Sequence, residues 1–277
     1  MRALPDAQSM KCPSGRICSD NDHVNASPVA KELHARAKRS WTGCLSVTDP
    51  RTQALADLYL YEGDLYCVHI AGFVPNIVAR ICAAGIIDEA QLRFIESSTA
   101  PEERSSVAGR FCVEQGWLAV EKLAEFNSEY LLAGLGAVLA IPKPVIRDQQ
   151  GAVTNSFCAL PAAIDDLLVS VDMRNARSRS LWSSVVPDSG PRQTVLAVTE
   201  GLDPGPFVAP ELGAFVTAVN GERSVDEVAA ACGLTRAEAS FIGAALVNEG
   251  VLTVVGTTGV AEGFHLVPED CFNSDSQ

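Results

Sequence analysis

The residues best suited to metal chemistry stand near the N-terminus, where Cys12, Cys18 and His23 form a Cys-x5-Cys-x4-His cluster. Thiolate and imidazole are ligands that zinc prefers, and a structural zinc site takes four of them. The cluster offers three ligands at an unusual spacing inside a polar segment, and no Cys-x-x-Cys pair occurs in the chain. We therefore expect no metal site, and a zinc site at Cys12, Cys18 and His23 remains the alternative.

Thiol chemistry is the second candidate, because the chain contains nine cysteines. Their number is odd and their spacing irregular, which is not the pattern of a disulfide framework. In apolar surroundings and a reducing compartment, a free cysteine behaves as a small hydrophobic residue. We expect six of them to be core residues of this kind: Cys44, Cys67, Cys82, Cys112, Cys158 and Cys232.

Catalytic motifs are missing from the sequence, which has neither a Gly-x-x-x-x-Gly-Lys-Ser/Thr phosphate loop nor a Gly-x-Ser-x-Gly elbow. The Gly134–Gly136 run resembles the start of a dinucleotide fingerprint, but it falls inside a helical pattern and indicates close helix packing. Asp165 and Asp166 are adjacent on a predicted helix, so their carboxylates point apart. His69 alternates with apolar residues on a predicted strand, which favours a structural histidine. We expect a protein that is not an enzyme and that binds no cofactor.

The elements that would position functional residues are clearest near the C-terminus, where Ser224–Glu227 and Thr235–Glu238 are two capping boxes. In each, a hydroxyl caps a helix start and a Glu three residues later binds back to the cap. Glycines at 221, 233 and 250 follow the apolar runs, as left-handed C-terminal residues do. Three helices and then a strand over Val251–Val255 predict a winged helix-turn-helix.

The N-terminal half predicts a small antiparallel sheet with packed helices. A helix opens at Ser27-Pro28 and ends in basic residues, which suit the negative pole of its dipole. Strands are expected over Cys44–Val47, Ala56–Tyr61 and Asp64–Ile70, the last two joined by a tight turn at Glu62-Gly63. Further helices are expected over Asn76–Ala84, Asp88–Glu96, Val113–Phe126, Ser128–Leu139 and Pro161–Val171, with a break in the pattern over Glu96–Ser106.

These elements predict an α+β fold of two domains, in keeping with a length of 277 residues. We divide the chain into an N-terminal tail (1–27), an α+β domain (28–172), a connector rich in Arg and Ser (173–194), a winged-helix domain (195–257) and a C-terminal tail (258–277). The longest apolar run, Leu131–Ile141, has 11 residues and stops at Pro142, well short of the roughly 20 that cross a bilayer. We expect a core helix there, no membrane contact and a cytoplasmic protein.

Charge argues against nucleic acid as the partner of the C-terminal module. The chain carries a formal net charge of −13, and residues 195–255 hold eight acidic residues against two basic ones, a local net of −6. A duplex-binding module neutralises phosphates with Lys and Arg, and this electrostatic attraction supplies most non-specific affinity. We therefore expect the module to contact another protein.

The N-terminal elements also resemble a known family. Leu33–Arg39, the strand Trp41–Val47 and the hairpin Leu58–Leu65 are similar to the PatA-like domain of unknown function that bacteria attach to response regulators and gliding-motility proteins. Ile77–Leu92 is similar to a helical motif inside such domains, and Asn220–Ala229 to the C-terminal module of longer family members. The resemblance implies a regulatory or scaffolding protein. It implies no catalytic residue, because the family carries no agreed set.

Two alternatives remain open beside a regulator that acts through a protein partner, with homo-oligomers allowed in each. On the leading interpretation the contact face is the exposed side of the last helix: Arg236, Glu238, Ser240 and Asn248. A transcriptional regulator that binds DNA as an oligomer would take its phosphate contacts from Arg174, Arg177, Arg179 and Arg192, with the Lys31–Arg39 region. The Gly221–Ser224 stretch also resembles winged helices that present precursor peptides to modifying enzymes, which bind a peptide as an added strand.

Overall fold

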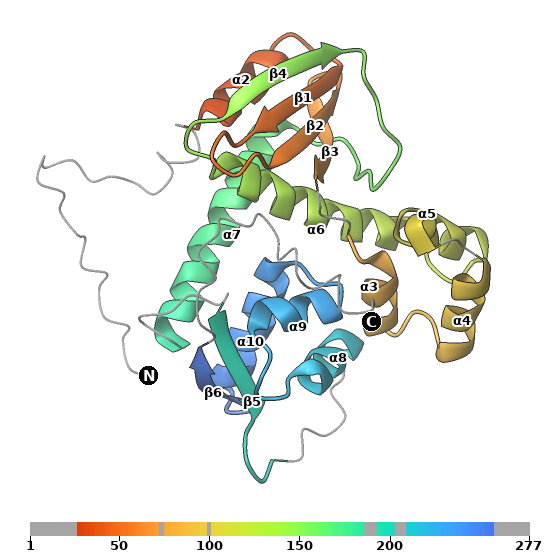
Figure 1. The fold of residues 1–277 in the computed structure, drawn as a ribbon, viewed down its shortest axis with the longest axis vertical. Coiled ribbons are helices and arrows are strands. Elements are labelled where there is room, and N and C mark those ends of the chain that lie inside the picture. The colour runs from red at the N-terminus through yellow and green to blue at the C-terminus, as the bar shows by residue number, and fades with distance from the viewer. Residues whose placement is uncertain (1–26, 72–74, 99–100, 186–192, 203–208, 258–277) are drawn as a thin grey trace, which may run out of the picture.

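The computed structural model describes residues 27–71, 75–98, 101–185, 193–202 and 209–257. The fold is α+β, with a small antiparallel sheet and packed helices. The sheet lies at one end of the molecule, α6 crosses beneath it, and α7 runs from the sheet towards the C-terminal helices (Figure 1).

The sheet in the described residues has four antiparallel strands in the order β3-β2-β1-β4. They are β1 (Gly43–Thr48), β2 (Leu55–Tyr61), β3 (Asp64–Ile70) and β4 (Val145–Gln150). The predictions of β1, β2 and β3 are confirmed, and Glu62 and Gly63 form the turn with positive φ values of 52° and 96°. We did not predict β4, because this edge strand is mostly exposed and polar and so lacks the alternation that marks a half-buried strand.

One face of the sheet is covered by α2 (Pro28–Ala37), α6 (Val120–Leu139) and the first half of α7 (Ile164–Val185). These helices and the strands share one apolar core, which includes Leu33, Leu58 and Leu135. At Gly134 a Cβ atom would meet Val68 Cγ1 of β3 at 2.9 Å, which confirms the close packing expected there. α2 begins with Pro28 in its first turn, as predicted.

A second apolar core lies among α3 (Ile77–Ala83), α4 (Glu89–Ser98), α5 (Pro101–Glu114) and the first half of α6. The predictions of α3 and α4 are confirmed. The single helix expected over Val113–Phe126 is wrong, because α5 ends at Glu114, and Gly116 turns the chain with φ +71° before α6 begins. The break expected up to Ser106 is also wrong from Pro101 onwards, since proline is well suited to the first turn of a helix.

The C-terminal elements are β5 (Thr194–Val198), α8 (Pro210–Ala218), α9 (Val225–Ala231), α10 (Arg236–Asn248) and β6 (Leu252–Thr257). Both predicted capping boxes are confirmed, with all their reciprocal hydrogen bonds. The predicted positive φ of Gly221, Gly233 and Gly250 is also confirmed. β5 was not predicted; it pairs with β6 in an antiparallel two-stranded sheet.

α7 links the two ends of the molecule, because Leu167 and Leu168 belong to the core under the sheet and Trp182 to the C-terminal core. Residues 173–185 of the expected connector therefore form the second half of this helix, and the predicted helix end at Val171 is wrong. Within the described ranges no single helix is long and apolar enough to span a membrane; α9 and α10 meet that composition only as a pair bent by 116°.

Candidate interaction site

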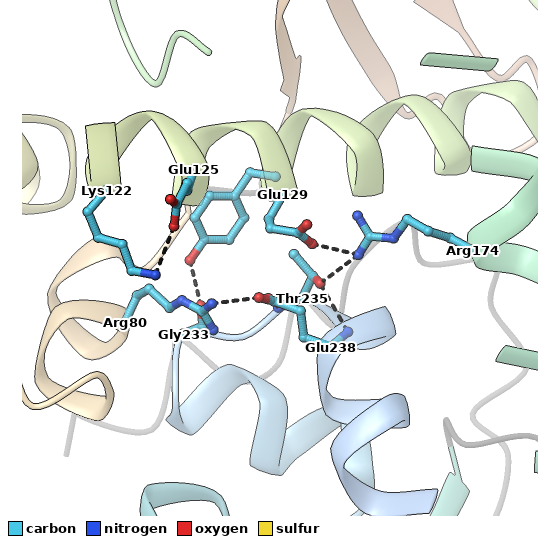
Figure 2. Close-up of polar contacts among 9 residues, drawn as sticks. Arg80, Lys122, Glu125, Glu129, Arg174, Gly233, Thr235 and Glu238 are labelled. Atoms are coloured by element: carbon cyan, nitrogen blue, oxygen red, sulfur yellow. Dashed lines mark hydrogen bonds and ion pairs between the residues drawn. The ribbon is translucent and has the colours of Figure 1, made fainter. Parts of the chain in front are cut away.

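A pocket lies where α6 faces the start of α10. It encloses about 710 Å³. Its floor and rim mix cations, carboxylates and two phenylalanines: Arg80, Lys122, Arg174, Glu121, Glu125, Glu129, Glu238, Phe126 and Phe241, with Ala124, Ser128 and Leu160. Several of these side chains belong to a network that joins α3, α6 and α7 to the C-terminal helices (Figure 2). We call that network the polar junction: Arg80, Glu129, Tyr130, Arg174, Gly233, Thr235 and Glu238.

The shortest ion pair of the polar junction joins Arg80 of α3 to Glu238 of α10. Arg80 Nη2 donates to Glu238 Oε1 at 2.6 Å, and both side chains are largely buried. The guanidinium also lies over the Phe126 ring, 4.8 Å from its centroid. The second oxygen of Glu238 accepts the backbone N–H of Thr235 at 2.8 Å, which completes the capping box. The Glu238 carboxylate thus neutralises the buried Arg80 of α3 and also caps α10, the helix to which Glu238 belongs.

A second pair joins α6 to α7 and reaches the same helix start. Arg174 Nη2 donates to Glu129 Oε2 at 2.8 Å and lies 3.4 Å from Thr235 Oγ1. Burial raises the pKa of Glu129, and the positive charge of Arg174 opposes this rise. The burial effect is the larger of the two, so the surroundings of Glu129 disfavour its charge although Arg174 is paired with it.

Tyr130 and Gly233 hold the end of α9 close to α6 and to the start of α3. The Tyr130 hydroxyl donates to the carbonyl of Gly233 at 2.6 Å, and burial raises the pKa of this phenol. Gly233 follows α9 with φ +63°, and a Cβ atom there would meet Arg80 N and Asn76 O at 2.5 Å. Only glycine allows the end of α9 to approach the start of α3 so closely.

The rim of the pocket is more exposed than the polar junction beneath it. Lys122 Nζ pairs with Glu125 at 2.8 Å and lies 5.3 Å from the centroid of Phe126. Arg177 lies over the Phe241 ring at 5.1 Å. Leu160, also at this rim, is 73% exposed. Exposed apolar surface with a polar rim is the composition of a contact surface.

Two of the four residues of the predicted contact face, Arg236 and Asn248, are exposed as expected, and Arg236 is also held in an ion pair. Asn248 is exposed at the end of α10, whereas Arg236 donates to both carboxylate oxygens of the buried Asp226 at 2.8 and 3.1 Å. Glu238 belongs to the polar junction. Ser240 is only 1% exposed, so its expected exposure is wrong. Ser240 lies among the buried residues of α10, which include Ala239, Gly243 and Ala244, and both α7 and α9 pack on this helix.

The three described arginines that were expected to contact phosphate differ in their surroundings. Arg174 is largely buried in its ion pair with Glu129, and Arg177 packs on Phe241. Arg179 is exposed on α7, and Arg192 lies outside the described residues. The Cys12, Cys18 and His23 cluster also lies outside them. In the part of the chain that the structure describes, no group of three His, Cys, Asp or Glu side chains could hold a metal ion.

The other candidate residues have structural partners. His69 Nε2 lies 3.0 Å from the carbonyl of Ser156, so it donates to that oxygen. Asp165 Oδ1 lies 3.1 Å from His34 Nδ1. Four of the six described cysteines are buried, as expected, but Cys82 and Cys158 are partly exposed.

Sequence reasoning missed Arg80, Glu129 and Tyr130. The signal for Arg80 was its position between Ala79 and Ile81 in an otherwise apolar helix, which indicates a paired interior charge. Nothing local indicated Glu129 or Tyr130. No protein-family model, curated protein or solved structure matches the chain, so the site is interpreted from its geometry.

Proposed function

We propose that the protein is a non-enzymatic regulatory or scaffolding protein that acts through protein contacts and carries a partner-binding pocket beside α6. The observation that carries this proposal is the docking of the α10 start against α3, α6 and α7. In a DNA-binding winged helix, this helix would enter the groove. Here its first turns contact the chain itself.

Charge supports the same proposal. The module has a local net charge of −6 over residues 195–255, and Arg223, one of its two arginines, directly follows Glu222 in the sequence. Arg236 is paired with the buried Asp226, so it offers little free charge to a phosphate. A DNA-binding function would need α10 to leave the polar junction and its contacts to be replaced by phosphate contacts.

The resemblance to the PatA-like family and the winged-helix assignment belong to this proposal. The small sheet, with its hairpin turn at Glu62-Gly63, supports the first. The order β5-α8-α9-α10-β6, with β5 and β6 antiparallel, supports the second. We further propose that the sheet end and the C-terminal end are two domains, joined by α7.

The chemistry of the pocket supports protein contact over catalysis. Its cations are bound by its own carboxylates: Arg80 by Glu238, Arg174 by Glu129 and Lys122 by Glu125. Such pairs position the helices but leave no base poised beside a nucleophile. The free features are the exposed Leu160 and the edge of Phe241, which suit an apolar side chain of a partner.

The test is site-specific photo-crosslinking with the full chain in the cells that express it. A crosslinking amino acid at position 160 is expected to capture one protein in stoichiometric yield. The same probe at Val145, an exposed apolar residue on β4, is the matched control and should capture little. Equal capture at positions 160 and 145 would contradict the proposal that the pocket binds the partner. Capture of a peptide only at Val254 of β6 would favour the peptide-recognition alternative.

A parallel titration distinguishes the DNA-binding alternative from the proposed protein-contact function. The protein is titrated with labelled duplex DNA at roughly 50 and 200 mM salt, where phosphate contacts give a steep loss of affinity. We expect no saturable binding. Micromolar binding that weakens with salt, and that is lost when Arg177, Arg179 and Arg192 are changed to Ala, would overturn the proposal. Arg174 stays unchanged in that variant because it holds the polar junction.

A further inference from the structure

The segment between β4 and α7 lies along the free side of β3. The amide of Ala159 donates to the carbonyl of Tyr66 at 2.9 Å, and Leu65 and Ala162 exchange both backbone hydrogen bonds at 3.1 and 3.0 Å. The two stretches run antiparallel, because higher numbers in β3 meet lower numbers in the segment. The residue after Tyr66 and the residue before Ala159 are therefore brought together, and both are cysteines.

The side chains of these cysteines meet at one carbonyl. Cys67 Sγ donates to Ser156 O at 3.3 Å, and Cys158 Sγ lies 3.7 Å from the same oxygen. Both sulfurs therefore lie within hydrogen-bonding reach of the same carbonyl oxygen. Cys67 is fully buried and Cys158 is partly exposed. This is the arrangement of a reactive thiol with a second thiol behind it.

We propose that Cys67 and Cys158 are an oxidation site, at which a peroxide converts the two thiols into an intramolecular disulfide. Cys158 is the thiol that reacts first, because it is the one of the pair that solvent reaches. The neighbouring Cys67 thiol lowers the pKa of Cys158, which favours the reactive thiolate. The neighbouring Cys158 thiol and burial raise the pKa of Cys67, which disfavours a thiolate at that position.

The reaction balances with hydrogen peroxide as the oxidant. The Cys158 thiolate attacks one peroxide oxygen, the O–O bond breaks, and Cys158 becomes a sulfenic acid while hydroxide leaves and is protonated to water. Cys67 then attacks the sulfenic sulfur, the S–O bond breaks, and a second water leaves with the Cys67 proton. In sum, two thiols lose two electrons and two protons to one peroxide, and one S–S bond and two waters form.

A local rearrangement follows from the bond. Neither sulfur carries a proton in the disulfide, so the thiol hydrogen bonds to the carbonyls of Thr154 and Ser156 are lost. The backbone of Cys158 is tied to α6, because Asn127 Nδ2 donates to its carbonyl at 2.8 Å. Leu160, two residues further on, lines the pocket beside α6. Oxidation is thus expected to change the backbone mobility of residues 154–160. This expectation does not depend on what the pocket binds.

The experiment treats the folded full-length protein with about one equivalent of hydrogen peroxide, blocks free thiols and maps the peptides without reduction. We expect the peptide pair that contains Cys67 and Cys158, with the loss of two free thiols per molecule. Cys82 is the internal control, because it is also partly exposed but burial raises its pKa, so it should stay reduced. Mapping also separates the pair from Cys12, Cys18 and Cys271, which lie outside the described residues.

Variants and hydrogen exchange complete the test. In Cys67→Ser, Cys158 should be trapped as a sulfenic acid, whereas in Cys158→Ser, Cys67 should stay reduced; Cys44→Ser, at the nearest other buried thiol, should still form the disulfide. Hydrogen exchange of the 154–160 amides should differ between the reduced and oxidised wild type. Oxidation of Cys82 as fast as Cys158, or a disulfide from Cys67 to Cys44, would overturn the proposal. Because the wild-type peptide map decides this alone, a variant that fails to fold leaves the test intact.

Discussion

The two sides of α6 are built in different ways. On the side towards the sheet, Leu131, Leu135 and Val138 lie in a core of apolar side chains. On the side towards the C-terminal helices, Glu129 and Tyr130 belong to the polar junction. Apolar burial is non-directional, so it holds α6 to the sheet without fixing a particular partner atom. Hydrogen bonds and ion pairs depend on distance and angle, so the polar junction holds the C-terminal helices in one orientation.

A substitution on the apolar side of α6 should cause the largest loss of stability. Leu135 is fully buried between α6 and the sheet, so Leu135→Ala should lower the free energy of unfolding by about 3 to 4 kcal/mol, from lost burial and the cavity left behind. Urea denaturation followed by circular dichroism measures this. Leu160→Ala, at an exposed leucine, is the control and should change the free energy by less than about 0.5 kcal/mol. A similar loss for Leu135→Ala and Leu160→Ala would contradict the placement of Leu135 in the core between α6 and the sheet.

Gly233→Ala should be the most damaging change on the polar side. A left-handed backbone costs a non-glycine residue about 1 to 2 kcal/mol, and the added Cβ would meet backbone atoms of α3 at 2.5 Å. Gly250→Ala is the matched control, because Gly250 has φ +75° with no neighbour within 4 Å of its Cβ position. We expect about 3 kcal/mol for Gly233→Ala against about 1 kcal/mol for Gly250→Ala, from urea denaturation. Equal losses would mean that α9 does not press on α3.

The Arg80–Glu238 pair should contribute less, about 2 kcal/mol of coupling in a double-mutant cycle. Glu238→Gln removes the charge but keeps an oxygen that can cap Thr235, so the cycle with Arg80→Met isolates the ion pair. Glu227→Gln is the control, because Glu227 has the same place in the α9 capping box but no ion-pair partner among the described residues. A coupling energy near zero would show that Glu238 acts only as a cap.

The same contrast explains which parts of the structure could be predicted from the sequence. The hairpin at Glu62-Gly63 and both capping boxes are short-range features, and their residues carry the signal themselves. The polar strand β4 gives no such signal, since it is held by pairing with β1, about 100 residues earlier. Arg80 and Glu238 lie 158 positions apart, so no local pattern shows that they meet. The exposure of Ser240 was misjudged for the same reason, because α10 packs against α7, a helix that is distant from it in the sequence.

The smallest expected effects are two pH dependences of opposite sign. Asp49, in the turn after β1, accepts the Arg51 backbone amide at 2.9 Å, which lowers its pKa despite burial. Its contribution to stability is present above the ordinary Asp pKa of about 3.9 and is lost as the pH falls through the lower folded value. Glu129 is the reverse case, because burial raises its pKa. Its folded state holds a proton more tightly, so stability falls as the pH rises above the ordinary Glu value of about 4.3.

Thermal unfolding measured from pH 3 to 6 should separate the two groups. Asp49→Asn should flatten the curve at its acid end, where the wild type loses stability as the pH falls. Glu129→Gln should instead remove a decline that the wild type shows as the pH rises past about 4.3. Each difference slope must stay below about 1.4 kcal/mol per pH unit, the limit for one proton. Difference curves of the same sign would mean that Arg174 outweighs the burial of Glu129, and that the polar junction stabilises this carboxylate as the turn stabilises Asp49.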